Sequence, residues 1–133
     1  MIKLLLVDDD KVVLTTLKEG ILTFIKNEQD ITISTCASLE EVTLLLDCNK
    51  EEIDVIAVDM FLGTGTGLEV INEFKKRQPS VGKIIITGYL HKFTKEMLKE
   101  GIFILQKPVR VEDLVSLVRI ISRYKDLQKA TYG

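Results

Sequence analysis

The sequence is poor in the residues that build zinc sites and disulfide frameworks. Its 133 residues include two cysteines, Cys36 and Cys48, and one histidine, His91. A structural zinc site takes about four cysteine or histidine ligands, and a disulfide framework takes several cysteine pairs. Both are therefore excluded, and two isolated thiols fit the reducing environment of the cytoplasm.

Long apolar runs and an excess of charge of one sign are also missing. A membrane-spanning helix needs about 20 consecutive apolar residues, and no run in the sequence approaches that length. The N-terminus begins with a strand-like run and lacks the charged and apolar regions of a signal peptide. The net charge is -2, which offers no broad attraction to nucleic acid. We therefore expect a cytoplasmic domain that binds neither membranes nor nucleic acid.

Short apolar runs alternate with helical patterns along the chain. Five runs predict strands, at residues 2–7, 31–35, 54–58, 83–86 and 102–105. The segments between and after them predict helices, at residues 11–26, from 38 onward, and at 68–77, 92–100 and 111–129. This alternation predicts an α/β fold, a doubly wound five-stranded parallel sheet with helices on both faces. Ligands of such sheets bind beyond the carboxyl ends of the strands.

Local signals predict how some of these segments begin and end. Glu41 lies three residues after Ser38, as in a capping box, and Asp10 is placed to cap the helix that follows it. Gly101 is expected to end the fourth helix. The stretch FLGTGTG, residues 61–67, contains three glycines and predicts a loop without regular structure.

Polar side chains follow four of the predicted strands, at the edge where ligands are expected. The first strand is followed by Asp8, Asp9 and Asp10, the third by Asp59, the fourth by Thr87 and the fifth by Lys107. Taken singly, each has an ordinary structural explanation, such as a helix cap or an exposed side chain. Together, clustered carboxylates need a cation to neutralise them, and hard oxygen ligands suit Mg²⁺. A metal, a nucleophilic carboxylate, a hydroxyl and an ammonium make a site for phosphoryl transfer.

The ordered motifs resemble the receiver domain of two-component response regulators. They are LLVDDD at residues 5–10, VDMFLGTGTGLEV at 58–70, IIITG at 84–88 and QKP at 106–108. The resemblance covers residues 2–123 and implies a flavodoxin-like (βα)5 fold with strand order 2-1-3-4-5. Accordingly, we expect a receiver domain over residues 1–123, with residues 124–133 as a helix extension or the start of a linker.

The resemblance also implies the roles of the site residues. Asp59 matches the phosphoacceptor, Thr87 the switch hydroxyl that binds a phosphoryl oxygen, and Lys107 the lysine that pairs with another. A cis peptide bond is implied between Lys107 and Pro108.

A ligand set for Mg²⁺ follows from the same resemblance. Asp9 matches the main acidic ligand and Asp8 its neighbour, which acts through metal-bound water. Asp59 and the backbone carbonyl of Phe61 match the remaining protein ligands.

The implied activity is signalling rather than enzymatic turnover. The domain would accept a phosphoryl group from a sensor histidine kinase or a phosphotransfer protein, and would catalyse only its own phosphorylation and slow dephosphorylation. The face formed by the fourth helix, fifth strand and fifth helix would then change its affinity for partners, including a second copy of the chain.

The sequence departs from the family pattern at three places. Ile104 stands where the family usually has an aromatic switch residue, and strand alternation points the adjacent Phe103 to the other face. Gly63 stands where a proline is common, four positions after Asp59. The segment 101–107 is one residue shorter than the common pattern.

Three alternatives remain open in the sequence. Asp8-x-Asp10 after an apolar strand also resembles the nucleophile motif of haloacid dehalogenase phosphatases. The glycines at 63–67 suggest a nucleotide or flavin loop, although neither a P-loop nor a G-x-G-x-x-G spacing is present. In the tail, Ile121, Tyr124 and Leu127 continue an apolar stripe, as in either a linker helix or a frayed terminal helix.

Overall fold

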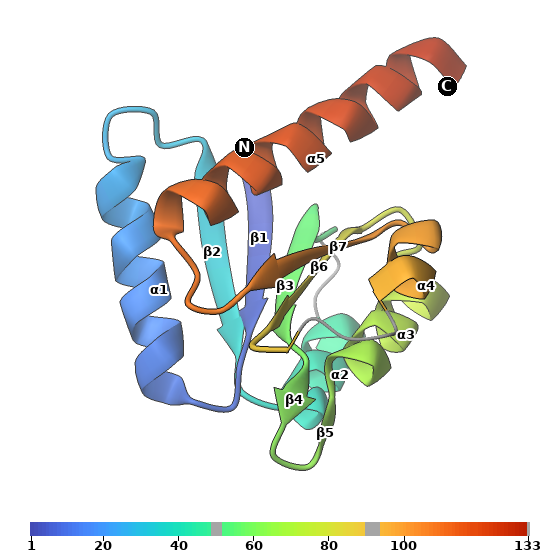
Figure 1. Ribbon diagram of the computed structural model, residues 1–133. Helices are drawn as coiled ribbons and strands as arrows, with labels where there is room; N and C mark the ends of the chain where they lie inside the picture. Colours follow the sequence, from blue (N-terminus) through green and yellow to red (C-terminus); the bar gives the residue numbers. More distant parts are fainter. Residues whose placement is uncertain (49–51, 90–93, 133) are drawn as a thin grey trace.

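The computed structural model describes residues 1–48, 52–89 and 94–132. At its centre lies a five-stranded parallel sheet in the order β2-β1-β3-β6-β7 (Figure 1). Its strands are β1 (Ile2–Val7), β2 (Ile31–Cys36), β3 (Val55–Asp59), β6 (Gly82–Thr87) and β7 (Ile102–Gln106). The predicted fold and the order 2-1-3-4-5 are confirmed, because β6 and β7 are the fourth and fifth strands of this sheet.

Helices cover both faces of the sheet. They are α1 (Lys11–Phe24), α2 (Leu39–Cys48), α3 (Gly67–Arg77), α4 (Thr94–Lys99) and α5 (Val111–Tyr132). One apolar cluster joins α1 and α5 to the sheet, and a second joins α2, α3 and α4 to its other face. The predicted start of the fourth helix at Lys92, and His91 before it, lie outside the described residues. Within the described ranges, no helix is long and apolar enough to cross a membrane.

The register of the central strands fixes which residues meet at the carboxyl edge. β3 is buried at every position, as expected of a parallel strand covered on both faces. Val7 pairs with Val58, and Asp59 pairs with Ile86. The residues that follow β1 and the last residue of β3 therefore leave the sheet side by side.

Side-chain caps begin α1 and α2 where the sequence predicts them. The Asp10 carboxylate accepts hydrogen bonds from the backbone N–H groups of Val12 and Val13, at 2.9 and 3.3 Å. Glu41 N donates to Ser38 Oγ at 3.1 Å. The Glu41 carboxylate reaches one residue further back than in the usual capping box, and accepts from Ala37 N at 2.8 Å.

The prediction of an irregular loop at residues 61–67 is wrong. Strands β4 (Phe61–Leu62) and β5 (Gly65–Thr66) pair in an antiparallel hairpin, and Gly67 already begins α3. Three glycines in this stretch are thus compatible with two short paired strands, whose turn residues Gly63 and Thr64 have no positive φ. Leu62, which is 5% exposed, anchors the hairpin in the core.

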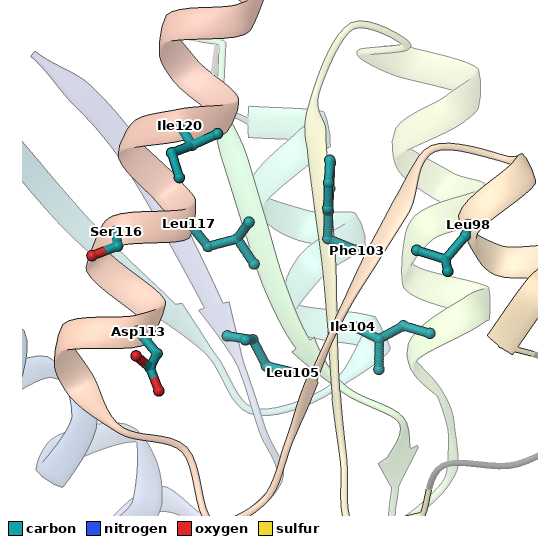
Figure 2. A pocket seen from close by; sticks show the side chains of 8 residues that line it. All are labelled: Leu98, Phe103, Ile104, Leu105, Asp113, Ser116, Leu117 and Ile120. Carbon is teal, nitrogen blue, oxygen red and sulfur yellow. The ribbon is translucent and has the colours of Figure 1, made fainter.

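Of the predicted tail stripe of Ile121, Tyr124 and Leu127, the structure buries Ile121. Ile121 is 5% exposed and packs against the sheet, whereas its neighbour Ile120 is 62% exposed. Tyr124 and Leu127, further along the same helix, are exposed. Ile120 also lines the groove between α4, β7 and α5 that Figure 2 shows, together with Phe103.

Candidate functional site

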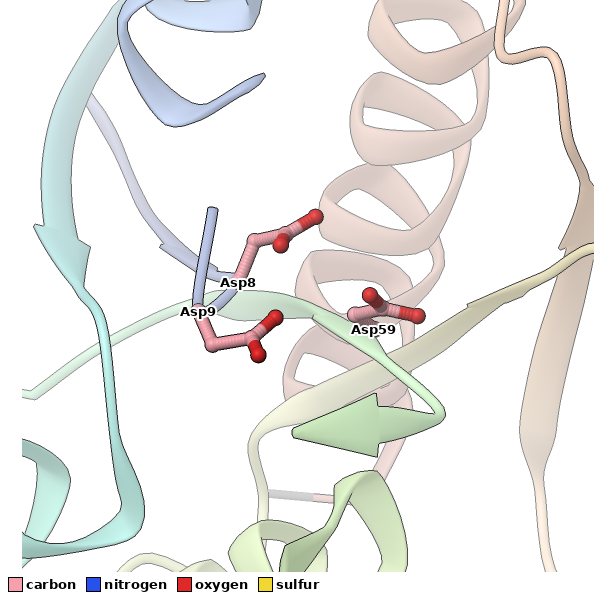
Figure 3. Close-up of side chains that lie close together, drawn as sticks. All are labelled: Asp8, Asp9 and Asp59. Carbon is pink, nitrogen blue, oxygen red and sulfur yellow. The ribbon is translucent and has the colours of Figure 1, made fainter. Parts of the chain in front are cut away.

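Three aspartates gather at the carboxyl edge of the sheet. Asp8, Asp9 and Asp59 each offer a carboxylate oxygen, and these oxygens lie within 4.8 Å of one another (Figure 3). Asp8 and Asp59 are buried, while Asp9 is exposed. Asp10 is not part of this cluster, because its carboxylate caps α1.

Hydrogen bonds orient each carboxylate of the cluster. Asp8 Oδ1 accepts from the backbone N–H of Asp10 at 2.9 Å. Asp59 Oδ1 accepts from Phe61 N at 3.4 Å, and Asp59 Oδ2 lies 3.1 Å from Lys107 Nζ. The cluster is therefore an ordered set of oxygens with one cation already beside it.

The electrostatics of the pocket disfavour further negative charge. Burial raises the pKa of Asp8 above its ordinary value, and the neighbouring carboxylates of Asp59 and Asp9 raise it further. The Asp10 N–H and the Lys107 ammonium lower this pKa, but they do not offset the other effects. A cation among the three carboxylates would relieve this repulsion, and a set of hard oxygen donors fits Mg²⁺.

Lys107 reaches the cluster from the far edge of the sheet. Its backbone N–H donates to Thr87 O at 2.8 Å, which ties the segment after β7 to the end of β6. The peptide bond between Lys107 and Pro108 is cis, as the resemblance implies.

The hydroxyl of Thr87 is engaged with its own loop. Thr87 is 4% exposed. Its Oγ1 donates to Tyr89 O at 3.2 Å and accepts from Tyr89 N at 3.1 Å. The candidate switch hydroxyl is therefore held by backbone groups two residues further along the chain.

Ile104 occupies the usual aromatic position in β7, and the adjacent Phe103 faces the opposite side of the strand, as strand alternation predicts. Ile104 is half-buried and packs against the cluster that includes Met97 of α4. Phe103 is 41% exposed.

Sequence reasoning missed one contact at this site. The backbone N–H of Gly63, at the turn of the β4–β5 hairpin, donates to Asp9 Oδ2 at 3.0 Å. A backbone donor has no sequence signature, but the absence of the common proline at this position is a signal that could have drawn attention to it.

Comparisons with known proteins agree with this architecture, in which a doubly wound sheet carries acids and a lysine at its carboxyl edge. The sequence pattern of the response regulator receiver domain matches residues 4–119. The chain therefore belongs to the family of response regulator receiver domains. No curated protein gives a significant match to the sequence.

Solved structures of similar proteins extend the match over nearly the whole chain. A response regulator receiver domain protein from Clostridium thermocellum is 28% identical with a TM-score of 0.79, and the match covers 96% of this chain and 98% of that one. A two-component response regulator from Clostridium difficile is 26% identical with a TM-score of 0.76, over 92% and 97% of the two chains. A structure described as adenylate cyclase from Rhodopirellula baltica is 27% identical with a TM-score of 0.83, over 97% and 93%.

Proposed function

We propose that this domain accepts a phosphoryl group on Asp59 and changes conformation in response. The position of the Asp59 carboxylate carries the proposal. It ends the buried central strand, lies 3.1 Å from Lys107 Nζ, and shares a cluster with Asp8 and Asp9. The donor is a phosphohistidine on a sensor histidine kinase or a phosphotransfer protein. The domain acts in the cytoplasm as a switch that controls an output or a partner.

The transfer forms one bond and breaks one. An Asp59 oxygen attacks the phosphorus atom in line, and the P–N bond to the donor imidazole breaks. The imidazole leaves with the bonding electron pair and takes a proton from solvent. Charge accumulates on the equatorial phosphoryl oxygens, and the Lys107 ammonium stabilises one of them.

Magnesium is part of the same proposal. Asp8, Asp9 and Asp59 would hold the ion together with the backbone carbonyl of Phe61. When bound, Mg²⁺ offsets the negative charge of the acids and of the incoming phosphoryl group. Burial raises the pKa of Asp8 most, and repulsion from the carboxylates of Asp59 and Asp9 raises it further; a cation would relieve that repulsion.

Thr87 would transmit the change to the surface. Its hydroxyl now bonds to the backbone of Tyr89, and a phosphoryl oxygen on Asp59 is a stronger, charged acceptor. We expect the hydroxyl to leave Tyr89 and the loop to follow it, which shifts the population between two states. Ile104 has no ring to rotate, so the loop carries the coupling.

The surface that receives this change includes the groove between α4, β7 and α5 (Figure 2). Its volume is about 450 Å³. It is lined by Leu98, Phe103, Ile104, Leu105, Asp113, Ser116, Leu117 and Ile120. This mostly apolar surface supports the expectation that partners, including a second copy of the chain, bind there.

Incubation with acetyl phosphate and Mg²⁺, followed by mass spectrometry, tests the proposal. The parent protein should gain one phosphoryl group, and peptide mapping should place it on Asp59. Asp59→Asn should gain none, because it keeps the shape but removes the nucleophilic charge. Asp10→Asn is the matched control, since asparagine also caps helices, and it should gain the group like the parent. A phosphoryl group on Asp8 in the parent would contradict the proposal.

A further inference from the structure

We infer that the backbone N–H of Gly63 is a positioning group that holds Asp9 in the orientation of a metal ligand. The inference rests on the proposed Mg²⁺ site and names a contact on which the ion's affinity depends. It also links the ion to the β4–β5 hairpin, which contributes this N–H from 54 residues further along the chain.

Asp9 needs such a contact more than the other two acids do. Asp8 and Asp59 are buried, and the Lys107 ammonium also lies beside Asp59. Asp9 is exposed at the end of β1, where a side chain has several rotamers open to it. In the part of the chain that the structure describes, the hydrogen bond shown to the Asp9 carboxylate comes from Gly63. This bond uses Oδ2 and leaves Oδ1 for a metal ion.

The hairpin presents this donor from a constrained position. Phe61 pairs with Thr66 and Leu62 with Gly65, which leaves Gly63 and Thr64 as the turn. The buried side chain of Leu62 fixes the near strand in the core. The Gly63 N–H is therefore held in place before any ion arrives.

The identity of residue 63 matters more for its backbone N–H than for its side chain. A Cβ atom at this position would lie 3.2 Å from Asp9 Oδ2, so a side chain there would shift the carboxylate by a few tenths of an ångström, a small effect. Proline, the common residue here by the resemblance, has no N–H and cannot make the bond. At this position the chain therefore has a hydrogen bond to the Asp9 carboxylate where the family pattern has the conformational restriction of proline.

Donors behind a metal ligand fix its orientation, and their loss typically costs about 10-fold to 100-fold in metal affinity. Coupling of this kind is reciprocal. If the Gly63 hydrogen bond favours Mg²⁺ binding, bound Mg²⁺ must favour the hydrogen bond by the same factor.

Calorimetric titration with Mg²⁺, without any phosphodonor, tests the inference. Gly63→Pro should weaken binding by about 10-fold or more. Gly63→Ala is the matched control, because it keeps the N–H and asks the carboxylate to move by only a few tenths of an ångström. It should bind within about threefold of the parent, a change worth under about 1 kcal/mol. Circular dichroism checks that both variants are folded.

Hydrogen exchange at the Gly63 amide gives a second measurement that does not alter residue 63. Without metal, Asp9→Ala should speed exchange of this amide, while added Mg²⁺ should slow it in the parent. These two results decide the inference if Gly63→Pro fails to fold. Two results would overturn the positioning role alone. One is equal Mg²⁺ affinity in the parent and in folded Gly63→Pro. The other is a Gly63 exchange rate that changes neither with Asp9→Ala nor with Mg²⁺. A parent protein that binds no Mg²⁺ would overturn the proposed metal site and this inference with it.

Discussion

Lys107 Nζ lies 3.1 Å from Asp59 Oδ2, although the two residues belong to the ends of strands separated by β6. The Asp59 side chain is 11% exposed and that of Lys107 is 41% exposed. The cation thus extends from the surface to a carboxylate that is largely shielded from water. This geometry makes the lysine a partner of the charge on Asp59, before and after the proposed phosphorylation.

Replacing Lys107 should separate metal binding from the response to phosphate. Lys107→Ala removes a positive charge near the acids, so Mg²⁺ affinity should stay equal or rise. The conformational response to beryllofluoride, a phosphoryl mimic, should weaken. Calorimetry measures the first effect and amide NMR shifts the second. A severe loss of Mg²⁺ affinity in this variant would contradict the role given to the lysine.

Thr87 should matter more than Ile104 for the conformational response. Beryllofluoride should shift the amide NMR signals of Gly88, Tyr89 and α4 in the parent, because the Thr87 hydroxyl leaves the Tyr89 backbone. Thr87→Ala should blunt these shifts. Ile104→Val, the matched control, removes one methylene from a half-buried aliphatic side chain and should barely alter them. Equal blunting by both substitutions would show that residue 104 acts as a switch without a ring.

An ion pair between α5 and the start of β2 should make stability depend on pH. Arg119 donates two hydrogen bonds to the Asp30 carboxylate, at 2.9 and 3.0 Å. The Arg119 guanidinium holds the pKa of Asp30 below its ordinary value. Since the folded pKa is the lower one, the stabilisation is complete above the unfolded pKa and is lost as the pH falls through the folded pKa.

Asp30→Asn should therefore lower the free energy of unfolding at pH 7 by about 1 kcal/mol, as for a partly exposed ion pair with two hydrogen bonds. The difference from the parent should shrink as the pH falls below 3.8, the ordinary pKa of aspartate. Urea denaturation at several pH values measures it. Glu28→Gln is the control, because the Glu28 side chain is 65% exposed in its contact with Arg119, and its effect should be smaller.

The two cysteines should differ sharply in reactivity. Burial, and to a smaller extent the charge of Glu41, raises the pKa of the Cys36 thiol to about 11. Cys48 is exposed. Because the thiolate is the reactive form, iodoacetamide at pH 8 should label Cys48 in the native protein and should label Cys36 only in denaturant. Mass spectrometry with the Cys48→Ser variant as a control checks this, and rapid labelling of Cys36 in that native variant would contradict it.

The sheet and its acidic edge could be predicted because both depend on local patterns. Apolar runs of four to six residues define the strands, and parallel strands necessarily bring their carboxyl ends to one edge. This is enough to place Asp8, Asp9 and Asp59 together. The exposure of Tyr124 and Leu127 could not be predicted in this way, because a helix can keep its apolar spacing beyond the surface against which it packs.

The contact between Gly63 and Asp9 could not be predicted in the same way. Its donor is a backbone N–H, which every residue except proline has, and its position depends on a hairpin that the sequence did not predict. The sequence also predicted that Thr87 lies at the carboxyl edge of the sheet, and the structure confirms this position. The bonds of its hydroxyl to Tyr89 depend on a turn that the residue types alone do not specify.

The three consecutive aspartates after β1 point to three different destinations. The Asp8 carboxylate lies in the pocket and accepts a hydrogen bond from the N–H of Asp10. The Asp9 carboxylate accepts one from the β4–β5 hairpin, and the Asp10 side chain caps α1. The three residues are identical in type, but each makes a different contact, so none of them can take over the contact of its neighbour. Deleting or inserting a single residue there would rotate all three assignments at once, so this junction should tolerate changes of residue type better than changes of length.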